Sequence, residues 1–256
     1  MKTTIAALLF LLLSISSALA QTKTALDFRS YNGHTEDRLS KLSRVIEKEV
    51  IAKVVKKTDK ACFDKLQPKV IAHASGSFTA PKLKQVVYLV DLGDSCHPRS
   101  QGTVRLAIAS GKNITTYGDV TGYYNIRQIT DINADGINEI LLEGSWLGQG
   151  YLSGFAKLVS IKPRGILTVS DFKQVYGDNS GATPDPNQVY QLASVISVTL
   201  NSPRQPIFKR DNYIAKCTSV DSEIPKCGDF RYMSSGKFPE YDEVKRFLSN
   251  LNFEKN

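Results

Sequence analysis

The sequence predicts a mainly β protein with flanking helices, in which antiparallel sheets form a partial propeller-like or sandwich core. Two observations lead to this fold class. Short apolar or alternating segments recur from about Val70 to Leu200, separated by Gly and Asn turns, and β-branched and aromatic residues in such segments favour strands. One segment on each side of this region has the apolar spacing of a helix.

The strand region includes a compact apolar run at Gln85–Val90 and an alternating segment at Thr103–Ile108. A turn at Ser110–Asn113 separates the latter from Ile114–Tyr117. The remaining expected strands are Tyr124–Thr130, Phe155–Ile161, Ile166–Val169 and Val189–Leu200. Two Pro-containing segments, Ser202-Pro203 and Gln205-Pro206-Ile207-Phe208, form a break in the pattern and end the strand region.

The two flanking helices are expected at Thr35–Lys57 and Pro239–Leu251. Thr35 suits an N-cap, and Pro239 suits a first turn. Apolar residues recur at three to four positions in both segments. They are Leu39, Leu42, Ile46, Val50 and Val54 in the first, and Tyr241, Val244, Leu248 and Leu251 in the second. An arm before the first helix contains a short strand candidate at Leu26–Arg29.

Residues 1–20 have the features of a secretory signal peptide. Lys2 precedes the apolar run Ile5–Leu13, and Ala18-Leu19-Ala20 supplies small residues for cleavage. The apolar run is short for a membrane span. We expect a secreted or periplasmic chain without a transmembrane segment after cleavage, with an N-terminal arm and helix over residues 21–60 and a β-rich domain with the C-terminal helix over residues 61–256.

The four cysteines predict disulfides in an exported chain. We favour the pairs Cys62–Cys96 and Cys217–Cys227, because each closes a short local loop. The competing interpretation is a catalytic thiol, either Cys96 beside His97 or Cys62 with His73. An oxidising compartment disfavours a free thiol.

The segment Asp131–Glu139 has the ligand spacing of a calcium loop. Oxygen-bearing side chains occupy positions one, three, five and nine, and glycine occupies position six. These residues are Asp131, Asn133, Asp135, Glu139 and Gly136. Ile137 would add its backbone carbonyl. Because strand-like segments lie on both sides, we expect the loop to form the tip of a β-hairpin rather than lead into a helix.

This pattern resembles the calcium loop of FG-GAP and VCBS repeats, because an apolar run and Gly144 follow Glu139. The segment Ala74–Phe78 is similar to the Gly-x-Phe opening of those repeats. The resemblance covers roughly residues 118–162 and implies a loop between two strands of a propeller blade. The last ligand in those repeats is most often Asp, where this chain has Glu139.

A loop of this kind in an extracellular module binds calcium with a dissociation constant of about 10⁻⁴ to 10⁻³ M. Free calcium at one to ten times that constant would stabilise the fold by roughly 0.4 to 1.4 kcal/mol. We therefore expect a structural calcium. The alternative is an Asp/Asn/Gly turn that satisfies its own backbone hydrogen bonds.

The best candidate for a partner surface is the Gly-rich stretch Gly144–Gly154, which holds Trp146 and Tyr151. Aromatic side chains among glycines can stack on sugars or hold an extended peptide, although a lone Trp in a strand also suits a core. A second expected exposed loop is Tyr176–Ser180, where Asp178, together with Asp185, could add metal ligands or simply form turns.

The sequence favours a non-catalytic, calcium-binding interaction or cell-envelope module. Its formal net charge of +8 suits anionic lipid, cell-wall polymer or acidic polysaccharide, and equally plain solubility. The sequence has no Arg-rich cluster with interleaved aromatic residues, so we do not expect nucleic-acid binding. The alternative function is a secreted hydrolase of glycans or esters that uses carboxylates such as Glu143 and Asp178, which would have to lie about 5 to 10 Å apart.

Overall fold

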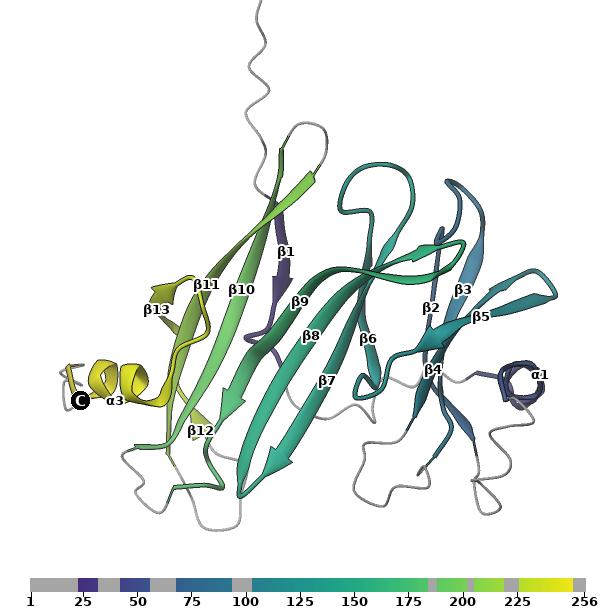
Figure 1. The fold of residues 1–256 in the computed structure, drawn as a ribbon. Coiled ribbons are helices and arrows are strands. Elements are labelled where there is room, and N and C mark those ends of the chain that lie inside the picture. Colours follow the sequence, from purple (N-terminus) through teal and green to yellow (C-terminus); the bar gives the residue numbers. More distant parts are fainter. Residues whose placement is uncertain are drawn as a thin grey trace, which may run out of the picture.

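The computed structural model describes residues 23–31, 42–55, 68–93, 103–183, 188–201, 205–218 and 226–250. Within them the chain forms two antiparallel sheets with a helix at each end of the molecule (Figure 1). The predicted class, mainly β with flanking helices, is confirmed.

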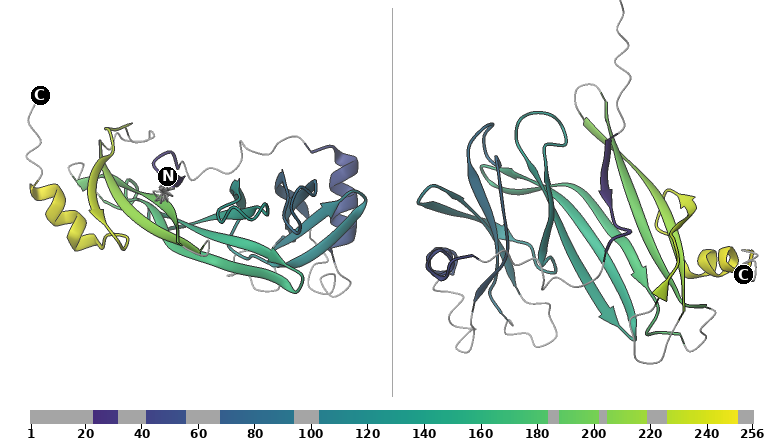
Figure 2. Two further views of the ribbon diagram at one scale, coloured as in Figure 1. Left: turned by 90° about the horizontal axis from the view of Figure 1, so that it is seen from above. Right: turned by 180° about the vertical axis from the view of Figure 1, so that it is seen from behind.

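The larger sheet has nine strands and curls along its length (Figure 2). Its main order is β12-β11-β10-β9-β8-β7-β6. In addition, β1 pairs with β10, and β13 pairs with β11. The strands are β1 (Lys23–Asp27), β6 (Asn125–Thr130), β7 (Glu139–Gly148), β8 (Tyr151–Lys162), β9 (Gly165–Asp178), β10 (Tyr190–Asn201), β11 (Gln205–Thr218), β12 (Lys226–Cys227) and β13 (Arg231–Ser235). Bulges between β8 and β9 add to the twist of these long strands.

The smaller sheet is a four-stranded meander. Its strands are β2 (Lys69–Gly76), β3 (Gln85–Asp91), β4 (Val104–Ser110) and β5 (Asn113–Asp119). This is the strand count of one propeller blade. The described residues do not repeat it, because all the other strands belong to the larger sheet.

Strand β7 contributes to a core on each of its faces, because successive side chains of a strand point to opposite sides. Ile140 and Leu142 pack with residues of the smaller sheet, such as Leu89 and Leu106. Leu141, which lies between them in sequence, enters a different core. The smaller sheet therefore packs against one face of β6 to β8.

The second core lies on the other face of the larger sheet. Phe28 and Tyr31 follow β1 and pack with Leu141, Leu158 and Val175. Phe28 is fully buried. The described part of the N-terminal arm is thus integrated into the β core.

Helix α1 (Arg44–Val54) covers the outer face of the smaller sheet through Val50 and Val54. The predicted helix over 35–57 is wrong in its bounds. Ser43 is extended and caps the helix, accepting a hydrogen bond from the Ile46 N–H. Thr35 and Lys57 lie outside the described residues.

Helix α3 (Tyr241–Asn250) lies within the predicted C-terminal helix. Its buried Val244 packs on Tyr190, Leu192 and Ile214 of the larger sheet.

Two predicted irregular segments are strands instead. The break at 202–208 is wrong for residues 205–208, because β11 begins at Gln205 and Pro206 pairs with Leu200. The predicted exposed loop at Tyr176–Ser180 is wrong as well. Tyr176 and Asp178 lie in β9 and are only 2% and 9% exposed.

The Cys217–Cys227 disulfide is present and joins β11 to β12. This pairing follows the sequence prediction. Cys62 and Cys96 lie outside the described residues, as do residues 1–20 and Asp185. None of the helices that the structure describes is long and apolar enough to cross a membrane.

Candidate functional site

The segment Asp131–Glu139 connects β6 to β7 in an antiparallel hairpin, as predicted. Thr130 pairs with Glu139 at its base. Ala134 and Gly136 adopt positive φ angles of 56° and 85°. Glycine reaches this conformation without a steric penalty, which explains its position at the sharpest part of the turn.

The loop side chains accept hydrogen bonds from the loop backbone. Asp131 accepts from the Asp135 N–H through Oδ1 at 3.1 Å and from the Gly136 N–H through Oδ2 at 2.9 Å. Asn133 Oδ1 also accepts from the Asp135 N–H, and Asp135 Oδ1 accepts from the Ile137 N–H at 2.8 Å. The turn is therefore internally hydrogen-bonded.

Glu139 is the buried carboxylate of this loop, with 2% of its surface exposed. Its Oε2 accepts from the Ile132 N–H at 2.9 Å. Burial raises the pKa of Glu139, the bond from Ile132 opposes this, and the charges of Asp135 and Asp131 raise the pKa further. Three carboxylates thus share a small region, one of them removed from water.

The oxygen atoms of the loop are of the type that binds a hard cation, but they are not arranged around a common centre. Carboxylate, amide and backbone oxygens are calcium ligands, and a carboxylate that accepts one N–H bond keeps further lone pairs. Within the described residues, however, no three His, Cys, Asp or Glu side chains are placed to hold a metal. No salt bridge in that part of the chain involves Asp131, Asp135 or Glu139.

The loop is tied to the smaller sheet by Asn138, a residue that the ligand pattern does not include. Asn138 Oδ1 accepts from the Ser77 N–H at 2.7 Å, and the Asn138 N–H donates to Ser77 O at 2.6 Å. Pro81 packs against Gly136, where a Cβ would lie 3.0 Å from it. The segment Gly76–Phe78, which carries the weaker part of the repeat resemblance, therefore contacts the loop.

Trp146 lies at the opposite end of β7 from the loop. It is seven residues beyond Glu139, which corresponds to roughly 23 Å along a strand. The side chain is 52% exposed, so it is not a core residue. Its ring lies over Gly148, where a Cβ would come within 2.1 Å of the ring.

Tyr151 lies on the same face as Trp146, because it pairs with Gly148 across a two-residue turn. It is half-buried, and its hydroxyl lies over Gly177. Burial raises the pKa of Tyr151. The two aromatic residues of the predicted partner surface are therefore neighbours, but they are distant from the loop.

Glu143, one of the two carboxylates considered for hydrolysis, is engaged in the fold. It is 5% exposed and pairs with Arg127 at 2.8 Å. It also accepts from Asn125 Nδ2 at 3.1 Å. The same Arg127 donates to the backbone carbonyl of Asp27 and stacks on the Phe28 ring. This pair thereby holds the N-terminal arm on the larger sheet.

Asp178 is engaged in a similar way. Its carboxylate accepts from the Ser180 N–H at 2.8 Å and from Gln191 Nε2 at 2.9 Å. The Tyr176 hydroxyl reaches it at 3.5 Å, and the Tyr176 ring packs 4.7 Å from that of Tyr31.

The two tyrosines lie between the carboxylates as neutral groups at neutral pH. Burial and then Glu143 raise the pKa of Tyr31 to about 12. Burial and then Asp178 raise the pKa of Tyr176. Two stacked tyrosines of the core thus adjoin the two carboxylates.

No family model matches the chain, and neither a curated protein nor a solved structure matches it.

Replacement of Arg127 by Met should lower the free energy of unfolding by about 3 to 5 kcal/mol, because Glu143 stays buried without its partner. The double variant Arg127→Met with Glu143→Leu should recover much of that loss. Denaturant unfolding of both variants measures the two effects.

The matched control is Lys237→Met, which removes the exposed Lys237–Glu240 pair and should leave stability nearly unchanged. If Arg127→Met were as mild as Lys237→Met, the Arg127–Glu143 pair would not hold the arm.

Proposed function

We propose that the chain is an exported, non-catalytic calcium-binding module, in which one calcium in the Asp131–Glu139 loop strengthens the junction between the two sheets. We further propose that the β7–β8 tip contacts an extracellular or envelope partner.

The observation that carries the calcium proposal is the oxygen spacing of the loop together with the burial of Glu139. Two further carboxylates raise its pKa, and the described residues supply none of the three with a cationic side chain. A divalent cation would offset this repulsion. The ligands would be Asp131, Asn133, Asp135, Glu139 and the Ile137 carbonyl.

The proposed role of the metal is structural. The loop contacts the smaller sheet through Asn138 and Ser77, so ordering of the loop also orders this contact. With binding in the millimolar to submillimolar range, the stabilisation is roughly 0.4 to 1.4 kcal/mol. That is a small fraction of the stability of a typical domain.

The FG-GAP and VCBS resemblance remains part of the proposal. Its support is the position of the loop between two antiparallel strands and its contact with Gly76–Phe78. An extracellular or periplasmic location is supported by the Cys217–Cys227 disulfide. The hydrolase alternative gains no support from Glu143 and Asp178, since both carboxylates are committed to neighbouring donors.

The proposed partner surface comprises Trp146 and Tyr151 at the β7–β8 tip. Trp146 is half exposed and rests on a glycine, so its ring offers a flat apolar face. Such faces stack on sugar rings or on peptide side chains. We propose envelope polysaccharide as the first partner class to test and protein as the second.

The calcium proposal predicts a rise in the thermal unfolding midpoint of about 1 to 5 °C in millimolar calcium relative to chelator. The rise should disappear in Asp131→Asn with Asp135→Asn, which keeps one side-chain oxygen acceptor at each position. Asp171→Asn, an exposed aspartate on β9, is the control and should retain it.

Glu139→Gln distinguishes the loss of calcium binding from a loss of fold stability. Glutamine keeps an acceptor for the Ile132 N–H and removes a charge whose ionised form the fold disfavours. In chelator its midpoint should be no lower than that of the unsubstituted chain, and calcium should not raise it. An unchanged calcium response in both sets of variants would eliminate the proposed ligands.

The partner proposal predicts that the chain co-sediments with insoluble envelope polysaccharide and that Trp146→Ala abolishes this binding without unfolding the protein. Leu167→Ala removes another half-exposed apolar side chain, on β9, and should bind normally. Undiminished sedimentation of Trp146→Ala would contradict the assignment of this surface.

A further inference from the structure

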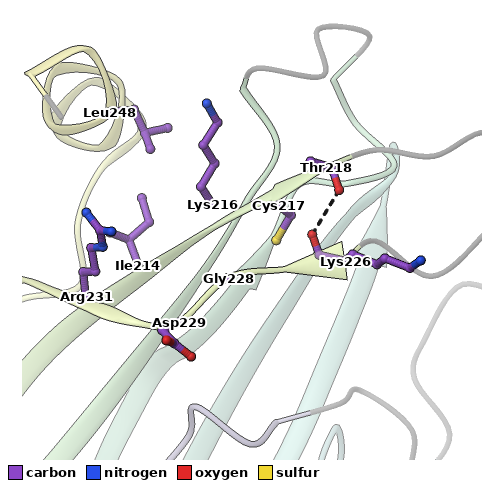
Figure 3. Close-up of a pocket in the computed structure, with 9 residues that line it drawn as sticks. All are labelled: Ile214, Lys216, Cys217, Thr218, Lys226, Gly228, Asp229, Arg231 and Leu248. Carbon is purple, nitrogen blue, oxygen red and sulfur yellow. Dashed lines mark hydrogen bonds between the residues drawn. The ribbon is translucent and has the colours of Figure 1, made fainter. Parts of the chain in front are cut away.

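A pocket of about 340 Å³ lies where β11, β12 and the segment that follows β12 meet α3. Figure 3 shows its lining side chains. Ile214, which is 2% exposed, and Leu248 of α3 form an apolar part. Lys216, Lys226 and Arg231 supply positive charge, and Asp229 supplies the one carboxylate among the lining residues.

The three cationic side chains point in different directions. Lys216 and Arg231 stand on the two sides of Ile214, on the side of the pocket where Leu248 lies (Figure 3). Lys226 and Asp229 point away from this group. The part of the pocket that faces α3 therefore combines two positive side chains with apolar surface.

We propose that this pocket binds a small amphipathic anion, whose phosphate or carboxylate head pairs with Lys216 and Arg231 and whose apolar part lies against Leu248 and the exposed edge of the Ile214 side chain. Hydrogen bonds from a cationic donor to such a head are the strong class of hydrogen bond. The volume falls within the range of small-molecule sites.

The walls of the pocket are preorganised. Cys217, which is 1% exposed, lines the pocket and is bonded to Cys227 across β11 and β12. Val244 of α3, which is fully buried, packs with Ile214. A site held by a disulfide and a buried helix contact loses little conformational freedom when a ligand binds.

This site is independent of the calcium loop. It lies at the β11–β12 edge of the larger sheet, whereas the loop precedes β7 near the β6 edge. The two sites can be tested separately in the same protein.

The test is calorimetric titration of the disulfide-intact chain with octyl phosphate, with inorganic phosphate in a parallel arm. Saturable one-site binding of octyl phosphate is expected. Lys216→Met and Arg231→Met should each weaken it by about tenfold, since each removes a charge-assisted hydrogen bond. The control Lys226→Met removes the same charge from a side chain that points away and should bind within about twofold.

Leu248→Asn tests the apolar part. It should weaken octyl phosphate binding and leave inorganic phosphate unaffected. Vesicles of anionic phospholipid form a third arm. Binding only to vesicles, equal binding of inorganic and octyl phosphate, or equal loss in Lys226→Met would each overturn the proposal. Thermal midpoints of all variants verify that the fold is intact.

Discussion

The register of β7 decides which side chains enter each of the two main cores. Ile140 and Leu142 pack toward the smaller sheet, while Leu141 and the Glu143–Arg127 pair lie on the opposite face. A slip by one residue would exchange these sets and place Glu143 where aliphatic side chains belong. The register is set at the start of β7, where Thr130 pairs with Glu139 and Asn138 exchanges two hydrogen bonds with Ser77. The hairpin loop therefore connects the two sheets as well as two strands.

The two buried glutamates of β7 illustrate two electrostatic solutions. Glu143 has the guanidinium of Arg127, which in turn binds the N-terminal arm. Glu139 has a backbone N–H donor and lies near two further negative charges. A charge removed from water is costly unless it is paired. A calcium ion in the loop would give Glu139 a compensating positive charge, as Arg127 does for Glu143. The same ion would fix the end of β7 from which the register of both cores follows.

Local patterns in the sequence were sufficient for the presence of strands β3 to β10, for the hairpin position of the loop and for the Cys217–Cys227 pair, because periodicity, turn residues and loop length are local. They were not sufficient for the length of β9, which continues from the expected Ile166–Val169 to Asp178. Non-local features were missed. Pro206 indicated a break, yet it lies in β11 and pairs with Leu200 of β10. Asp178 resembled a turn residue but is satisfied by Gln191 of the adjacent strand. Trp146 is near the loop in sequence, whereas an extended β7 separates them. The Asn138–Ser77 contact joins residues 61 positions apart, which a single sequence does not reveal.

Residue-resolved amide hydrogen exchange, in calcium and in chelator, tests most directly whether the loop controls the junction between the sheets. Calcium should slow exchange of the Ser77 N–H and the Asn138 N–H together with the loop amides, although neither residue is a proposed ligand. The segment around Phe78, held by Gln85, should follow. Slowed exchange confined to residues 131–139, with Ser77 unchanged, would contradict the account, because calcium binding would then be a local property of the loop.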